Sequence, residues 1–196
     1  MDVGSSTQGR RVFEVAGIAG SLRRGSFNRA LLKAAVEGAP PQLRISPYEI
    51  GDLPLYNADV ESSALPPAVS ALRESVRRSD GVLIATPEYN HGVPGVLKNA
   101  IDWLSRPPRE SALDGKVAAI MGASPGMAGT ARSQAQLRQA FVFTNTYALL
   151  QPEVLVARAH EKFNANGELT DQPTREFLKT FLTRFVELLE RLTRAG

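Results

Sequence analysis

The residues best suited to chemistry lie in three short segments, and the first is the turn at residues 19–28. It reads Ala-Gly-Ser-Leu-Arg-Arg-Gly-Ser-Phe-Asn and stands between a short apolar run and a helical pattern. A turn of this kind directs backbone N–H groups and the positive end of a helix toward one point, which suits a phosphate. The hydroxyls of Ser21 and Ser26 can add donors, and Arg23 or Arg24 can add positive charge. We therefore expect a phosphate-bearing ligand at this turn.

Other interpretations of this turn fit less well. A nicotinamide-dinucleotide fingerprint needs G-x-G-x-x-G, but Gly17 and Gly20 do not supply its first pair, and the nearest acidic residue to the expected ribose position is Glu49. A P-loop is excluded because no Gly-Lys-Ser/Thr follows. A plain strand-to-helix turn capped by Ser26 remains the alternative, because serine is a preferred N-cap residue.

The second segment covers residues 86–95 and reads Thr-Pro-Glu-Tyr-Asn-His-Gly-Val-Pro-Gly. Its prolines stiffen the backbone and its glycines allow close approach, so it can offer N–H groups to the polar edge of a flat ring, with Tyr89 alongside. The alternative is a structural turn in which Tyr89 packs on a neighbour and Glu88 is a surface charge. Histidine can act as a general acid, but His91 has no visible partner, so we expect it beside a ring or substrate instead.

The third segment, residues 122–132, is again rich in glycine. Ser124 and the glycines can contact the edge of a ligand, and Arg132 is a candidate for binding a second anion. Met127 is expected to fill a gap in the packing, because methionine is flexible and apolar.

The bulk composition limits the kinds of function. The 196 residues include no cysteine, which excludes disulfides and thiolate catalysis and suits the cytoplasm, and the two histidines exclude a histidine-rich metal site. The net charge of +3 is scattered, which favours a solvated surface over nucleic-acid binding. No apolar run is long enough to span a membrane. Residues 1–10 lack the apolar core of a secretory signal, and we expect them to form a flexible tail.

The elements that must position these segments alternate along the chain. Apolar runs predict strands at 12–18, 43–48, 81–85, 117–121 and 154–156, and apolar periodicity predicts helices at 28–37, 66–79, 94–105, 131–143 and 173–193. Pro47 marks the second strand as an edge, and residues 50–65 are expected to be a long loop. Strict alternation favours one domain over residues 11–196, a three-layer α/β sandwich around a five-stranded parallel sheet in the flavodoxin-like order 2-1-3-4-5. In such a sheet the three segments follow strands 1, 3 and 4 and meet at one edge.

Two stretches of this sequence, residues 20–28 and 87–106, resemble the NAD(P)H-dependent FMN reductases, and are closest to the bacterial chromate and quinone reductases. The resemblance extends over about residues 11–190 and implies non-covalently bound FMN. The residues it implies for the phosphate are Ser21, Arg23, Ser26, Phe27 and Asn28. Those it implies for the isoalloxazine ring are Pro87, Glu88, Tyr89, Asn90 and His91, largely through their backbone, with Ser124 on the other side of the ring.

The resemblance also implies an activity. It predicts a homodimeric or homotetrameric enzyme that passes electrons from NAD(P)H through FMN to quinones, chromate or related small acceptors in a ping-pong sequence. The flavin does the chemistry, so no catalytic side chain is required. His91 stands where the family often has Tyr or Ser, which makes it a candidate modulator of acceptor choice. The choice between NADH and NADPH stays open, with Arg132 among the basic residues that could favour a 2′-phosphate.

Two other functions remain alternatives. A flavodoxin-type electron carrier would share the fold and FMN but refuse the hydride of NAD(P)H. Such carriers are typically acidic with a threonine-rich phosphate loop, whereas this chain has a sequence pI near 9.4 and arginines in the turn. A regulatory domain that has lost its cofactor is the second alternative.

Overall fold

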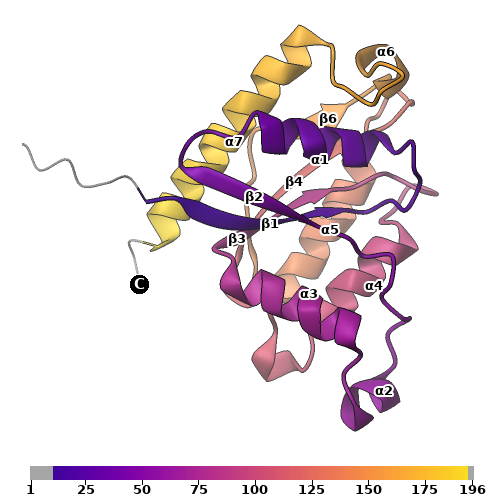
Figure 1. The fold of residues 1–196 in the computed structure, drawn as a ribbon, viewed down its shortest axis with the longest axis vertical. Coiled ribbons are helices and arrows are strands. Elements are labelled where there is room, and N and C mark those ends of the chain that lie inside the picture. The colour runs from indigo at the N-terminus through magenta and orange to yellow at the C-terminus, as the bar shows by residue number, and fades with distance from the viewer. Residues whose placement is uncertain (1–10, 194–196) are drawn as a thin grey trace, which may run out of the picture.

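The computed structural model describes residues 11–193, so the tail expected at residues 1–10 lies outside the described residues (Figure 1). The central strands are β1 (Phe13–Ala19), β2 (Leu43–Tyr48), β3 (Gly81–Ala85) and β4 (Val117–Ala123). They are parallel and lie in the order β2-β1-β3-β4, so β2 is an edge strand, as its proline indicates. The predicted flavodoxin-like order is confirmed.

The fifth position of the sheet is divided between two short strands. β5 (Tyr147–Ala148) pairs with the start of β4, where Tyr147 faces Val117, and β6 (Val154–Val156) pairs with its end, where Val154 faces Met121. Both pairings are parallel. The sequence predicted β6 and missed β5, because a two-residue strand carries no detectable periodicity.

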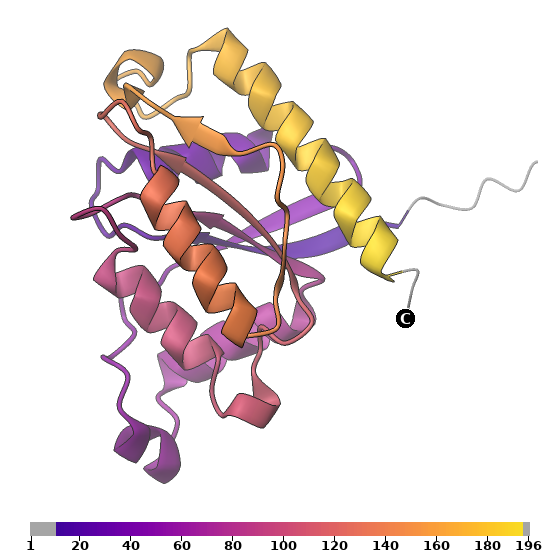
Figure 2. The same ribbon diagram turned by 180° about the vertical axis from the view of Figure 1, so that it is seen from behind.

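Helices cover both faces of the sheet (Figure 1). On one face lie α1 (Phe27–Glu37) and α7 (Gln172–Thr193), and on the other lie α3 (Pro67–Arg78), α4 (Gly95–Leu104) and α5 (Ala131–Phe143), of which α4 and α5 are seen best from behind (Figure 2). Alternate residues of each central strand point into opposite layers, so that Leu83 joins the first core and Ile84 the second. This is why β3 and β4 read as unbroken apolar runs, whereas the edge strand β2 alternates buried and exposed residues over its first four positions.

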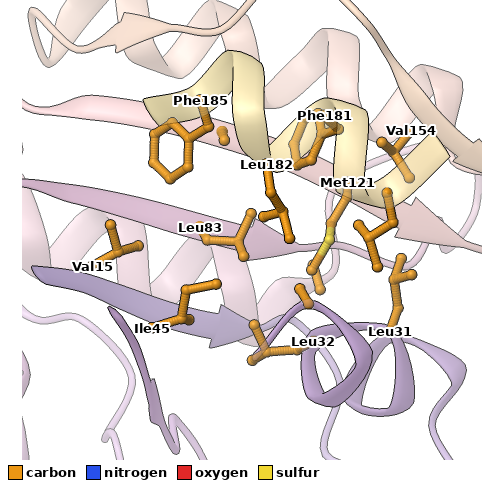
Figure 3. Close-up of a cluster of buried hydrophobic side chains, with 14 of the residues drawn as sticks. Val15, Leu31, Leu32, Ile45, Leu83, Met121, Val154, Phe181, Leu182 and Phe185 are labelled. Atoms are coloured by element: carbon orange, nitrogen blue, oxygen red, sulfur yellow. The ribbon is translucent and has the colours of Figure 1, made fainter. Parts of the chain in front are cut away.

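The core under α1 and α7 is a continuous apolar layer. Figure 3 shows Leu31 and Leu32 of α1 and Phe181 and Leu182 of α7 pointing toward the strands, where Met121 lies between them. Each of these side chains is at most 4% exposed. Burying a side chain of this size contributes about 1.5–3 kcal/mol, so this layer holds α1, and with it the turn at its N-terminus, firmly against the sheet.

Outside the core the structure differs from several expectations. The expected loop at residues 50–65 contains a short helix, α2 (Ala58–Ser63), which has no buried residue and projects from the body of the fold (Figure 1). Trp103 of α4 is fully buried, and its Nε1 donates to the carbonyl of Pro54 at 2.8 Å. Met127 is 70% exposed, so the expectation that it fills a packing gap is wrong.

Two smaller findings complete the fold. A 3₁₀ turn (Pro108–Glu110) precedes β4, and a four-residue helix, α6 (Ala159–Lys162), follows β6. Among residues 11–193, no helix combines the length and the hydropathy needed to cross a membrane.

Candidate functional site

The three chemistry-bearing segments meet at the carboxyl edge of the sheet. We call them the first turn (residues 20–28), the hairpin (residues 86–94) and the third loop (residues 122–130). Parallel pairing continues into each of them: Gly20 donates its N–H to Ala85 at 2.9 Å, and Thr86 donates to Met121 at 2.9 Å. In the third loop, Ser124 donates to Val156 of β6 at 2.9 Å. The predicted convergence of the three segments is therefore present in the structure.

A buried asparagine ties the first turn to the third loop. The amide nitrogen of Asn28 donates to the carbonyl of Ala123 at 2.8 Å, and the N–H of Ala123 donates to the amide oxygen of Asn28 at 2.9 Å. Asn28 is 3% exposed. A paired, buried amide of this kind holds two backbone segments at a fixed distance, because losing either bond would leave a polar group without a partner.

The first turn presents an anion-binding surface. Ser26 is the N-cap of α1, and its hydroxyl accepts from the N–H groups of Asn28 and Arg29 at 3.2 and 3.4 Å. Among the residues that the structure describes, none accepts a hydrogen bond from the N–H of Arg24 or Gly25. The first turn of α1 contains no acidic residue, and a Cβ built on Gly25 meets nothing within 4 Å. Free donors, positive charge and open space together suit a phosphate.

A tyrosine joins the first turn to the hairpin. The hydroxyls of Ser21 and Tyr89 are 3.3 Å apart, and the same Ser21 oxygen accepts from the N–H of Arg23 at 3.4 Å. Ser21 is buried, whereas Tyr89 is 46% exposed, so its ring lines the surface beside the first turn. This contact places the first turn and the hairpin next to each other.

The hairpin closes through a two-residue turn of unusual composition. Tyr89 and Gly92 exchange two backbone hydrogen bonds, at 3.1 and 3.0 Å. Between them Asn90 has φ 51° and His91 has φ 61°. Positive φ at both central residues defines a type I′ turn, for which Asn-Gly is the favoured sequence. A histidine in the second of these places is uncommon, and its side chain is exposed at the tip of the hairpin.

The hairpin is fastened to the N-terminus of α5 by Glu88. Its carboxylate accepts from the N–H groups of Arg132 and Ser133 at 2.9 and 3.2 Å, and from the Arg132 guanidinium at 3.1 Å. Thr130, at the N-cap position, makes no side-chain cap bond, so Glu88 caps α5 from a distant part of the chain. Its side chain is 8% exposed, which rules out the surface-charge interpretation. Burial alone would raise the pKa of Glu88, but the hydrogen bonds from Ser133 and Arg132 outweigh it and hold that pKa below its ordinary value.

Two further contacts fix the hairpin from the same helix. The hydroxyls of Thr86 and Ser133 lie 2.9 Å apart, and Gln136 accepts from the N–H of Val93 at 2.8 Å. A Cβ on Gly92 would lie 2.7 Å from the Gln136 side-chain oxygen, so this contact favours glycine at the closing position. Gln136 was not a candidate from sequence, because its partner is 43 residues away and no local pattern joins them.

The third loop is shaped by close packing. A Cβ on Gly122 would lie 1.9 Å from the Thr130 hydroxyl and 2.5 Å from the carbonyl oxygen of Thr86, so no other residue fits there. Ser124 accepts from the N–H of Gly126 through its hydroxyl, at 3.1 Å, and from the N–H of Ala159 through its carbonyl, at 3.0 Å. The loop is thus held both to the hairpin base and to α6.

The comparisons with known proteins agree with this geometry. The family model described as NADPH-dependent FMN reductase matches residues 13–161. An NAD(P)H-dependent FMN reductase of Pseudomonas aeruginosa is 48% identical over 179 residues, covering 91% of this chain and 96% of the relative. A quinone reductase of Pseudomonas putida is 45% identical over 185 residues, covering 94% and 98%.

A solved structure gives the same result. The flavoenzyme NAD(P)H:(acceptor) oxidoreductase FerB of Paracoccus denitrificans aligns with a TM-score of 0.84 and 40% identity, over 92% of this chain and 98% of that chain. These likenesses extend over nearly the whole sequence and include all three segments of the site. The chain belongs to the NADPH-dependent FMN reductase family, and it is a flavodoxin-like oxidoreductase that uses FMN as cofactor and NAD(P)H as co-substrate.

Proposed function

We propose that this protein is a quinone reductase that takes electrons from NAD(P)H and delivers them to quinones at a site formed by the first turn, the hairpin and the third loop. The observation that carries the proposal is that the N–H groups of Arg24 and Gly25 have no acceptor within residues 11–193, in a turn that Ser21 joins to Tyr89 of the hairpin. The Pseudomonas putida relative is a quinone reductase at 45% identity, which supports quinones as the acceptor class. Chromate stays a prediction.

The residues of the first turn are suited to the FMN phosphate. In this proposal Ser21, Arg23 and the N-terminus of α1 bind it, with Ser26 holding the helix end in place. Asn28 uses its amide to tie the turn to Ala123, and the Phe27 ring packs against Phe163 with centroids 5.6 Å apart. We therefore assign these two side chains a supporting role, with any contact to the cofactor made by their backbone.

The hairpin is suited to the isoalloxazine ring. Its residues Pro87 to His91 present backbone groups and the Tyr89 ring, and Ser124 approaches from the third loop. The Glu88 carboxylate is fully engaged at α5, so Glu88 would face the ring through its backbone alone. A platform fixed by three separate contacts to α5 can hold a flat ring in one orientation without paying entropy when the substrate arrives.

Bound FMN supplies the redox chemistry, because it can accept a hydride from reduced nicotinamide and return two electrons to a quinone. The chain's own residues bind and orient; no side chain has to act as a nucleophile or base. Tyr89 and His91 are exposed at the mouth of the site, where they can contact either substrate. Donor and acceptor use this one place in turn, which predicts ping-pong kinetics.

Anaerobic stopped-flow mixing tests the proposal. Mixing the FMN-loaded protein with NADPH or NADH is expected to bleach the flavin absorbance, and a second mixing with benzoquinone is expected to restore it. Initial rates at several quinone concentrations should give parallel double-reciprocal lines, and intersecting lines would contradict the ping-pong sequence. A flavin that neither coenzyme bleaches would favour the electron-carrier alternative.

We also infer that the protein assembles as a homodimer or homotetramer. Exposed apolar side chains support association: Val142 and Leu150 line one hollow and are 84% and 68% exposed, and Phe143, next to Val142 in the sequence, is 72% exposed. Apolar side chains gathered in this way often mark an interface between proteins. Light scattering of the FMN-loaded protein is expected to give two or four times the mass of 21.2 kDa, and a monomer would contradict the inference.

A further inference from the structure

A pocket of about 770 Å³ opens beside α1 and shares Arg24, Gly25, Ser26 and Phe27 with the first turn. Its lining includes Arg24, Ser26, Lys33, Glu49, Phe163 and Asn164. These residues come from the first turn, α1, the end of β2 and the segment after α6. No residue of the hairpin or the third loop lines it. Its volume falls within the roughly 300–1,000 Å³ that small-molecule sites occupy.

The pocket adjoins the proposed FMN site through shared elements. Ser26 lines the pocket and caps α1, and of the two neighbouring arginines Arg24 lines the pocket while Arg23 does not. The opposite wall begins at His160, directly after Ala159, whose N–H donates to Ser124 at 3.0 Å. A long ligand can therefore occupy the pocket at one end and the flavin site at the other.

The pocket combines apolar walls with a cationic rim. Phe163, Leu32 and Val36 contribute apolar surface, and Asn166 adds an amide to the lining, whereas the amide of Asn164 is already bonded to Glu168 and Asn166. The one acidic residue in the lining is Glu49, which is already paired with Arg29 at 2.6 Å.

Two cations remain available to a ligand. Within residues 11–193 no carboxylate forms an ion pair with Arg24. The ammonium of Lys33 lies 3.8 Å from Glu37, a loose and exposed contact that contributes little. A ligand that suits this pocket has a flat apolar ring, polar groups on the edge of that ring and a negative charge.

We propose that this pocket binds the adenosine 2′-phosphate end of NADPH, with Arg24 and Lys33 contacting the phosphate. The inference rests on the proposed function and deepens it, because it names which coenzyme the enzyme prefers. Arg132, the other candidate for this phosphate, does not line the pocket, and its Nη1 already donates to Glu88 at 3.1 Å. The preference for NADPH over NADH then comes from charge-assisted hydrogen bonds that the 2′-hydroxyl of NADH cannot form.

Calorimetry on the FMN-loaded protein tests the pocket directly, with 2′,5′-ADP as the probe and 5′-AMP as its control. We expect 2′,5′-ADP to bind at least about tenfold more tightly, and the double variant Arg24→Gln/Lys33→Gln to remove that difference. Arg78→Gln is the matched control, since Arg78 is an exposed helical cation with an acidic partner four residues away, as is Lys33. Equal binding of the two probes, or tight binding that survives the double variant, would overturn the proposal.

A competing explanation is that the probe occupies the FMN phosphate site. In that case 2′,5′-ADP would bind the FMN-free protein, and FMN would prevent its binding. That result would contradict the proposal that 2′,5′-ADP binds the pocket. Binding that is the same with and without FMN is the expected result.

Steady-state kinetics provides the second readout. The double variant is expected to raise the KM for NADPH about tenfold relative to the KM for NADH, compared at equal FMN content measured by absorbance. An unchanged KM ratio with both coenzymes active would refute the pocket inference and leave the proposed function intact. If neither coenzyme reduces the flavin, the proposed function fails, and calorimetry still decides the pocket.

Discussion

The first turn and the hairpin lie side by side at the same edge of the sheet, but they differ in whether their polar groups form hydrogen bonds within the protein. The first turn leaves the N–H groups of Arg24 and Gly25 without partners among the described residues. The hairpin uses Thr86, Glu88 and Val93 to bind α5. Backbone N–H groups without a partner are available to bind a ligand, whereas polar groups that already form hydrogen bonds within the protein hold the hairpin in its shape. Damage to the first turn should therefore weaken binding, and damage around the hairpin should weaken the fold.

The largest expected effect is at the base of the hairpin. In Gly122→Ala the new methyl group would collide with the Thr130 hydroxyl and the Thr86 carbonyl, so we expect a loss of about 3 kcal/mol or more of folding free energy, or no folded protein. Gly25→Ala is the matched change in the first turn, where the methyl group meets nothing, and it should stay within about 1 kcal/mol of the parent. Urea unfolding measures both, and similar stabilities for the two variants would contradict the contrast.

The next effect belongs to the first turn. Arg23→Ala combined with Ser26→Ala should weaken FMN binding about 30-fold, because the charge of Arg23 and the Ser26 cap that holds the helix end in place are lost together. Riboflavin, which has no phosphate, should lose much less. Fluorescence titration with each flavin checks this, and an equal loss for both would rule out a phosphate role. Arg23→Ala alone is the control that keeps the helix cap, whose loss itself costs about 1 kcal/mol of stability.

A smaller effect is expected at Glu88. Replacing it by glutamine weakens the cap on α5, so Glu88→Gln should lose on the order of 1 kcal/mol of stability at pH 7. The pKa of Glu88 is lowered by folding, so its contribution is complete above its ordinary value of 4.5 and is lost as the pH falls through the depressed value. Urea unfolding at pH 7 and near pH 3 should therefore show the difference between parent and variant shrinking in acid. A difference that grows in acid would show that the carboxylate does not stabilise the fold.

The smallest effects concern the tip of the hairpin. His91→Gly places the favoured Asn-Gly pair in the type I′ turn and should stabilise the protein by about 0.5 kcal/mol, measured by thermal unfolding. His91→Tyr keeps the strained backbone, so it should not stabilise the protein. It should instead change the ratio of kcat/KM between two quinones while FMN content stays the same. Loss of the flavin from His91→Tyr would contradict the modulator role.

Much of the fold could be predicted because buried strands and helices have recognisable patterns of apolar residues. β3 and β4 are unbroken apolar runs, and α7 repeats apolar residues at helical spacing, so both their type and their order were recognised. α2 was missed because none of its residues is buried and it therefore has no apolar stripe. The two-residue β5 is defined only by its partner strand.

The location of the candidate site could be predicted from the sequence, but most of the contacts within it could not. Glycine, proline and serine after three strands indicated where the segments meet. The roles of Glu88 and Asn28 depend on partners 44 and 95 residues away, which no local pattern reveals. The left-handed conformation of His91 was also hidden, because glycine rather than histidine normally signals it.

The amide bridge between Asn28 and Ala123 has a consequence for biosynthesis. Because the first turn is braced by a residue from the second half of the chain, β4 must be synthesised before that turn can take its final shape. FMN should therefore bind only after β4 has been synthesised. A fragment of the chain that ends before β4 should bind no FMN and remain colourless.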